Sequence, residues 1–203
     1  MLKRALTVNE IRKYHAKTVP FEGEWYDTIG VPELTGAWII WGRSSNGKTH
    51  FALQLAKYLA KFCRTAYNSI EEGLSLSMQK AIAEVGFSDV KRNFVLLDKE
   101  SIADLKERLK KQRSPQVIII DSLQYTGLTY AEYKDLRDSF RNKLFIFISH
   151  ADGQEPKGNV ARDVRYDAFV KIRVEGYKAF PQSRYGGGKE YIIWQQGANQ
   201  YWG

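Results

Sequence analysis

The octapeptide at positions 42–49 constrains this chain more than any other feature. It consists of Gly42, Arg43, Ser44, Ser45, Asn46, Gly47, Lys48 and Thr49, and it fits the phosphate-binding loop (P-loop) pattern without a mismatch. An apolar run typical of a buried strand precedes it at 37–41, and apolar residues at helical spacing follow it: Phe51, Leu55, Leu59 and Phe62. A strand, a glycine loop and a helix in this order gather backbone N–H groups and the positive end of a helix dipole at one concave site. We therefore predict that residues 42–49 hold the phosphates of a nucleoside triphosphate.

Three side chains are expected around these phosphates. Lys48 is predicted to reach the β- and γ-phosphates, and Thr49 to supply a hydroxyl to Mg²⁺. Asp121 ends a wholly apolar run at 117–121, and a strand that is apolar throughout is typical of a central position in a parallel sheet. Its carboxylate then emerges at the edge where ligands of open α/β sheets bind. We predict that Asp121 holds Mg²⁺ opposite Thr49; the alternative is an aspartate that caps the following loop.

Composition limits the class of protein. With 203 residues, of which 43% are hydrophobic and 27% charged, the chain is expected to be one soluble globular domain. No apolar run approaches the roughly 20 residues of a membrane span, and no signal peptide is expected. Cys63 is the single cysteine, and we expect a buried thiol in a protein of the reducing cytoplasm.

The charge balance favours a polyanionic partner. The formal net charge is +8, a balance typical of proteins that bind nucleic acid. A merely basic soluble surface is the alternative. The basic run of Lys106, Arg108, Lys110, Lys111 and Arg113 is interpreted as a solvated helix face rather than a binding patch.

Residues 1–29 are expected to form an N-terminal helix and arm. Thr7 and Glu10 have the spacing of a capping box, which predicts a helix from there to about Lys17. Proline and glycine residues then predict a loop that carries Trp25 and Tyr26. We expect this arm to pack on its own domain, with contact to a neighbouring subunit as the alternative.

Strands and helices alternate through the core expected at 30–203. Strands are predicted at 65–70, 93–97, 117–121 and 144–150. Helices are predicted between them, one with Leu74, Met78, Ile82 and Val85 as its apolar stripe, one capped at Ser101 and one at about 130–141. This alternation predicts an α/β fold with a mostly parallel, doubly wound sheet.

The last quarter of the chain has a different pattern. It contains a polar loop at 151–158 that we expect to be mobile, a short helix at 159–166, an alternating strand at 169–175, a glycine-rich turn at 182–189 and a final strand at 191–194. These segments predict a C-terminal antiparallel meander beside the parallel sheet.

Five short motifs occur in a fixed order. They are the P-loop, Ser69-Ile70-Glu71-Glu72, Ile120-Asp121-Ser122-Leu123-Gln124, Ser149-His150 and Ser183-Arg184-Tyr185-Gly186. In this order they resemble the RecA-like ATPases, most closely the core of the RadA/Sms group and the minimal RecA-like recombinases of phages, over about 30–194. The chain differs from RadA in having Gln182 where RadA's Lys-Asn-Arg-Phe-Gly motif has lysine. Neither a four-cysteine zinc module nor a C-terminal protease-like domain is expected, and neither is the N-terminal collar of the replicative helicases.

The resemblance implies a RecA-like P-loop NTPase fold of eight strands, with the strand that ends at His150 between the strands that end at Gly42 and Asp121. It implies ATP and Mg²⁺ as ligands, with Glu71 (or Glu72) activating the attacking water and His150 sensing the γ-phosphate. A helix N-terminal charge pair and a capping or core histidine are the respective alternatives. Arg184 is implied as a finger on a neighbour's ATP, which requires a homo-oligomeric ring or filament; an exposed turn arginine is its alternative.

The resemblance also places nucleic-acid contacts in the segment after the sensor, at Lys157, Arg162 and Arg165. The leading hypothesis is an ATPase that couples hydrolysis to single-stranded DNA in recombination, annealing or repair. The alternatives are a DnaB-like hexameric helicase motor, a small-molecule P-loop kinase, and an ATP-gated assembly factor that barely hydrolyses its nucleotide.

Overall fold

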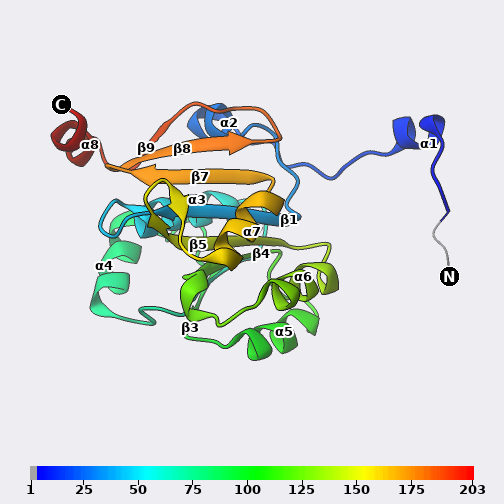
Figure 1. The fold of residues 1–203 in the computed structure, drawn as a ribbon, viewed down its shortest axis with the longest axis horizontal. Coiled ribbons are helices and arrows are strands. Elements are labelled where there is room, and N and C mark those ends of the chain that lie inside the picture. Colours follow the sequence, from blue (N-terminus) through cyan, green and yellow to red (C-terminus); the bar gives the residue numbers. More distant parts are fainter. Residues whose placement is uncertain (1–3) are drawn as a thin grey trace.

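The computed structural model describes residues 4–203, and a sheet of mixed direction forms its centre. The strands are β1 (Gly36–Gly42), β2 (Thr65–Ser69), β3 (Phe94–Asp98), β4 (Val117–Asp121), β5 (Leu144–Asp152), β6 (Glu155–Pro156), β7 (Val170–Glu175), β8 (Lys178–Ser183) and β9 (Tyr191–Ile192). Their order is β3-β2-β4-β5-β1-β7-β8-β9, with β6 paired to β5. The strands from β3 to β7 in this order are parallel, and β8 and β9 are antiparallel (Figure 1). β5 lies between β1 and β4, as the resemblance implies for the strand that carries His150.

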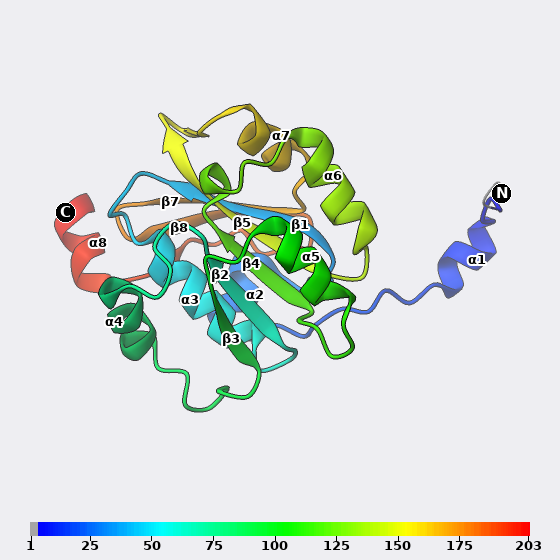
Figure 2. The same ribbon diagram turned by 90° about the horizontal axis from the view of Figure 1, so that it is seen from below.

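Helices cover both faces of the sheet, which confirms the doubly wound prediction. The helices are α1 (Val8–Lys13), α2 (Gly23–Ile29), α3 (Lys48–Leu59), α4 (Leu76–Val85), α5 (Ile102–Lys110), α6 (Tyr130–Ser139), α7 (Asn159–Asp167) and α8 (Gln195–Trp202), with a 3-10 turn at Leu123–Tyr125. Buried residues of α2, α3 and α4 belong to one core cluster, and those of α5, α6 and α7 belong to the other. The two layers lie on opposite sides of the strands (Figure 2).

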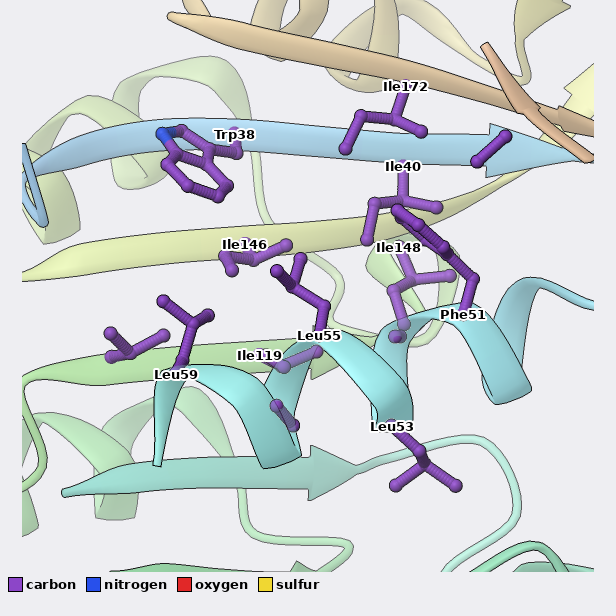
Figure 3. Close-up of a cluster of buried hydrophobic side chains, with 14 of the residues drawn as sticks. Trp38, Ile40, Phe51, Leu53, Leu55, Leu59, Ile119, Ile146, Ile148 and Ile172 are labelled. Atoms are coloured by element: carbon purple, nitrogen blue, oxygen red, sulfur yellow. The ribbon is translucent and has the colours of Figure 1, made fainter. Parts of the chain in front are cut away.

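The first core cluster explains why the P-loop helix is held in place. Phe51, Leu55 and Leu59 of α3 are fully buried and face strand residues such as Ile40 and Ile119 (Figure 3). β4 is buried along its whole length, as its continuous apolar run predicts. Because α3 packs on the centre of the sheet, its first turn is fixed relative to the ends of β1 and β4.

Three N-terminal predictions were partly wrong. The capping box at Thr7 is present, but the helix ends at Lys13 and Tyr14 is already extended. The predicted loop around Trp25 is helix α2, because Trp25 stacks on Tyr58 and Tyr191 with ring centroids 5.4 and 4.6 Å apart. These aromatic contacts between distant segments stabilise a helix that its own sequence favours weakly. Packing of the arm on its own domain is confirmed for Trp25, whereas α1 has no buried residue and projects from the body (Figure 1).

The predicted apolar faces of α3 and α4 each included one residue outside the helix. Phe62 lies beyond the end of α3 and Leu74 lies before the start of α4, and both side chains are exposed. Cys63 is half-buried rather than buried, at the margin of the first core cluster.

The C-terminal quarter differs most from the prediction. Segment 151–158 is not a free loop: β5 continues to Asp152 and pairs with β6. β8 was not predicted, since Pro181 interrupts its pattern, and proline occurs in sheets chiefly at edges and bulges. The final strand stops at Ile192, and α8 follows it. The antiparallel arrangement of this region is nevertheless confirmed. Within residues 4–203 no helix has the length and apolar content to cross a bilayer.

Candidate nucleotide site

The P-loop is held open by contacts to its own atoms and to β7. Gly42 ends β1 so close to its neighbour that a Cβ would lie 2.1 Å from the Val174 carbonyl oxygen. Asn46 donates to the Ser44 carbonyl at 2.9 Å and accepts from the Gly176 N–H at 2.8 Å. Gly47 has φ of 95° and is the N-cap of α3, which begins at Lys48. The loop therefore presents a preformed turn at the N-terminus of a buried helix, the arrangement that binds phosphate.

Lys48 lies over this turn. Its ammonium donates to the Arg43 carbonyl at 2.9 Å. Partial burial lowers its pKa, and the nearby carboxylates of Asp121 and Glu71 oppose that change. A desolvated cation beside a helix N-terminus is stabilised electrostatically when an anion binds next to it.

Asp121 lies at the end of β4, 9% exposed. It accepts a hydrogen bond from the Tyr67 hydroxyl. Burial raises the pKa of Asp121 to about 6; the Tyr67 hydrogen bond and Lys48 act against that change, and Glu71 adds to it. Burial also raises the pKa of Tyr67 well above its usual value, with Asp121 acting in the same direction and Thr49 against it. Tyr67 thus lies between the two predicted Mg²⁺ ligands.

The oxygen atoms at this point suit a nucleotide-bound magnesium ion. Residues 4–203 contain no group of three or more His, Cys, Asp or Glu side chains that could hold a metal by itself. Mg²⁺ in phosphate-transfer sites is held by one or two protein oxygens and by substrate phosphates. The hydroxyl of Thr49 and the carboxylate of Asp121 provide that number.

Glu71 and His150 meet next to Asp121. The carboxylate of Glu71 accepts from Ser122 Oγ at 2.9 Å and lies 3.2 Å from His150 Nε2. The backbone N–H groups of Ile70 and Glu71 donate to the Asp121 carbonyl at 2.6 and 3.1 Å. These contacts join the ends of β2, β4 and β5. The side chains of Glu71 and His150 therefore lie next to each other beside the P-loop.

Glu72 has a different environment. Its carboxylate accepts from Ser75 Oγ at 3.2 Å and Ser77 Oγ at 2.9 Å, at the start of α4. These contacts assign Glu72 to the helix N-terminus. Of the two glutamates, Glu71 is therefore the one that contacts His150.

Gln124 belongs to the motif at 120–124, and its role was not predicted from the sequence. Its amide N–H₂ donates to Ser149 Oγ at 2.8 Å and to the Lys157 carbonyl at 2.9 Å, and its oxygen accepts from the His150 N–H at 3.2 Å. This side chain joins β5 to the segment that precedes α7. The sequence feature that could have indicated this role is its position two residues after Ser122, just beyond the end of β4.

An aromatic pocket of about 610 Å³ opens beside Gly47, and the sequence did not predict it. Tyr177 and Trp194 form one wall, with perpendicular rings 5.0 Å apart. His50 and Glu84 form another, with 2.8 Å between Nε2 and the carboxylate. The pocket has the size and lining of a site for a small organic group.

The predicted nucleic-acid residues lie around the β5–β6 hairpin, on the same edge as the P-loop. Lys157 is exposed. Arg162 lies 3.5 Å from the Asp152 carboxylate. Arg165 is 2.8 Å from Glu155, with its guanidinium over the Trp41 ring at 5.3 Å. Two of the three cations are thus already paired with acids of the hairpin.

Arg184 is not brought to the P-loop of its own chain. It follows β8, and the register of β7 with β8 places Ser183 opposite Val170, at the end of the sheet remote from Gly42. Its guanidinium lies 4.8 Å from the centre of the Phe169 ring.

No protein-family model matches the chain, and no curated protein matches it by sequence. Solved structures do match its fold. The flagellar accessory protein FlaH from Methanocaldococcus jannaschii gives a TM-score of 0.60 at 18% identity, over 88% of this chain and 92% of that chain. A second solved structure, the ATPase domain of another protein, gives a TM-score of 0.53 at 15% identity, over 77% of this chain and 79% of that chain.

The fold is RecA-like. It is an α/β fold with a mostly parallel sheet and antiparallel strands at its C-terminal side, as predicted. Identities this low show the fold alone. The closer likeness to the RadA/Sms group stays a prediction.

The raised pKa of Asp121 predicts a pH-dependent stability of the protein without nucleotide or metal. The folded state keeps the carboxyl proton up to about pH 6, whereas the unfolded chain releases it near 3.8. The protonated Asp121 carboxyl therefore contributes to the free energy of unfolding. This contribution is fully present below the unfolded-state pKa and is lost as the pH rises through 6. A shift of this size corresponds to about 3 kcal/mol, so above pH 6 we expect Asp121→Asn to be the more stable protein. Denaturant titrations across the pH range measure the difference, which shrinks as the pH falls. Asp163→Asn, on the exposed face of α7, is the control, and an equal effect there would contradict the assignment.

Proposed function

We propose that this protein is a Mg²⁺-dependent ATPase whose P-loop binds the triphosphate. Lys48 would contact the β- and γ-phosphates. Thr49 and Asp121 would hold Mg²⁺, which would supply positive charge to the transferred phosphoryl group. Glu71 accepts a proton from the attacking water as the water oxygen bonds to the γ-phosphorus. The bond between the γ-phosphorus and the β,γ-bridging oxygen breaks, which releases ADP and inorganic phosphate. His150 contacts the γ-phosphate. The main support is the convergence of Lys48, Asp121 and Glu71 at one edge of the sheet.

The aromatic pocket is proposed as the site of the nucleobase. It adjoins Gly47, so a nucleotide with its phosphates in the P-loop can place its base against Trp194. Stacking on an aromatic side chain is worth about 1–3 kcal/mol per base. Trp194→Ala is accordingly expected to weaken ATP binding about tenfold.

Calorimetric titration with ATP and with inorganic tripolyphosphate tests this assignment. Tripolyphosphate has no base, so its affinity should be unchanged in Trp194→Ala. Tyr201→Ala, an exposed aromatic of α8 outside the pocket, is the matched control. Equal losses for ATP and tripolyphosphate would place the base elsewhere.

Coupling to single-stranded DNA and assembly into a homo-oligomer complete the proposal. The segment from the β5–β6 hairpin through Arg165 is the proposed element that responds to DNA, because Gln124 joins it to His150. Arg184 lies far from the P-loop of its own chain, so its proposed role is on a neighbour's ATP. We assign residues 30–203 to the ATPase core and residues 1–29 to an N-terminal helix and arm.

The decisive experiment is the rate of phosphate release from ATP and Mg²⁺ with and without single-stranded DNA, beside light scattering with nucleotide present. Stimulation by DNA in an oligomer supports the proposal, and equal rates contradict the coupling. Strand displacement on a forked substrate would instead indicate a helicase motor. Phosphorylation of a small molecule would indicate a kinase. ATP binding without turnover would indicate an assembly factor.

A further inference from the structure

Exposed cations gather at the edge of the sheet opposite the nucleotide site. We define the basic edge as Lys17, Lys61, Arg64, Lys91, Arg92, Lys111, Arg113 and Arg141, all exposed. All except Lys17 lie in the segments that lead into β2, β3, β4 and β5. Lys17 lies between α1 and α2, and it reaches the start of β1 because the next residue, Thr18, is bridged to Glu33. The ion pairs beside these cations join Lys57 to Asp89 and Lys110 to Glu107, and neither lysine belongs to the basic edge. Among the described residues, no member of the basic edge forms an ion pair.

Hydrogen bonds join these segments into one surface. Arg64 donates to the Arg113 carbonyl at 3.2 Å, and the Gln116 N–H donates to the Arg64 carbonyl at 2.8 Å. The Gln116 amide donates to the Leu34 carbonyl at 3.0 Å, which connects the starts of β4 and β1. Because neighbouring strands are about 4.8 Å apart, the starts of five adjacent strands extend over about 20 Å.

A groove of about 420 Å³ lies within this surface. Its walls are Lys17, Val19, Leu34, Thr35, Phe62, Cys63, Gln116 and Asn142. Phe62 is 39% exposed, and its ring stacks on Phe21 with centroids 6.0 Å apart. An exposed aromatic face, side-chain amides and flanking cations therefore occur together.

The edge that carries the P-loop has mixed charge. Its cations, such as Lys48, Arg162 and Arg165, are accompanied by acids at or just after the strand ends: Glu71, Glu72, Asp98, Asp152 and Glu155. Arg162 and Arg165 are paired with two of these acids. A long polyanion is therefore attracted more strongly to the basic edge than to the hairpin.

We propose that the basic edge binds single-stranded nucleic acid, with phosphates on its lysines and arginines and a base in the groove against Phe62. This combination of backbone cations and an aromatic platform is the general solution for single strands. The groove favours a flexible strand over a flat lipid surface, because a bilayer offers no planar group to insert beside Gln116 and Asn142. The surface is distinct from the nucleotide site and extends the proposed function.

Charge reversal at three strand starts tests the proposal. The variant Lys91→Glu, Lys111→Glu, Arg141→Glu is compared with Lys80→Glu, Lys99→Glu, Lys134→Glu, which makes the same charge change at exposed lysines elsewhere. Binding of fluorescent oligothymidylate is measured by anisotropy without nucleotide, and melting temperatures verify folding. The basic-edge variant is expected to bind the oligonucleotide about 100-fold more weakly or worse. The slope of log affinity against log salt concentration should become less steep by about 2, since each phosphate contact of a single strand contributes about 0.7 to that slope. Equal losses in the two variants overturn the proposal, as does charge-dependent binding to phosphatidylserine vesicles without binding to the oligonucleotide.

Cys63 provides a second, independent measurement at the groove. It is the only cysteine in the chain, and burial raises the pKa of its thiol, so its alkylation by iodoacetamide is slow and easily followed. Bound oligothymidylate is expected to slow this reaction further, and Phe62→Ala to weaken binding about tenfold. An unchanged alkylation rate at saturating oligonucleotide would exclude the groove. Neither assay needs ATP hydrolysis, so an inactive ATPase leaves this proposal standing.

Discussion

Glu71→Gln is expected to lower the rate of ATP hydrolysis by about 10²–10⁴-fold, the range attributed to a general base. The amide keeps the shape of the side chain and its contacts to Ser122 and His150, but it cannot accept the proton of the attacking water. Affinity for ATP should therefore stay within a few-fold of the wild type. Single-turnover hydrolysis and calorimetric ATP titration measure the two quantities separately.

Glu72→Gln is the matched control, because its carboxylate contacts Ser75 and Ser77 at the start of α4. It should retain hydrolysis. If Glu72→Gln loses activity and Glu71→Gln keeps it, the assignment of the base is wrong. If neither change affects a measurable rate, the general base is another group.

Lys48→Ala is expected to weaken ATP binding about 100-fold or more, since removal of one partner of a desolvated charge pair costs about 2–5 kcal/mol. The same change should not destabilise the protein without nucleotide. Burial already lowers the pKa of Lys48, and alanine is a good residue for the first turn of a helix. Calorimetric titration and thermal melting give both results.

Lys80→Ala, on the exposed face of α4, is the control for a general loss of positive charge. A loss of ATP affinity in Lys80→Ala equal to that in Lys48→Ala would contradict a specific phosphate contact. A large loss of stability in Lys48→Ala would show instead that this side chain supports the loop.

The centre of the molecule could be predicted because its signals are local and strong. The apolar run before Asp121 specifies a strand buried on both faces, and the P-loop pattern specifies a strand, a turn and a helix. Parallel strands then bring Asp121, Glu71 and His150 to one edge. Their contacts with Ser122 and Tyr67 follow from the order of the strands and from side-chain packing, which the sequence does not display.

The periphery could not be predicted, because it depends on contacts between distant segments. α2 owes its stability to the stacking of Trp25 on Tyr58 and Tyr191, and β8 contains Pro181 within its pattern. The aromatic pocket needs Tyr177 and Trp194 together, two residues from separate turns.

The basic edge illustrates the same limit for surfaces. Lys61, Lys91, Lys111 and Arg141 are widely spaced in the sequence. They share a surface because each precedes a strand of one parallel sheet. A predicted parallel sheet places the residues before each strand at one edge. The basic run at 106–113 was instead assigned wholly to a solvated helix face, which is wrong for Lys111 and Arg113, because α5 ends at Lys110.

A crystal structure with Mg²⁺ and a non-hydrolysable ATP analogue tests the central claim most directly. The account predicts the γ-phosphate beside Lys48, Mg²⁺ held by Thr49 with Asp121 directly or through one water, and Glu71 facing the position of the attacking water. A triphosphate bound away from the P-loop, or Mg²⁺ bound without Thr49 and Asp121, would contradict it.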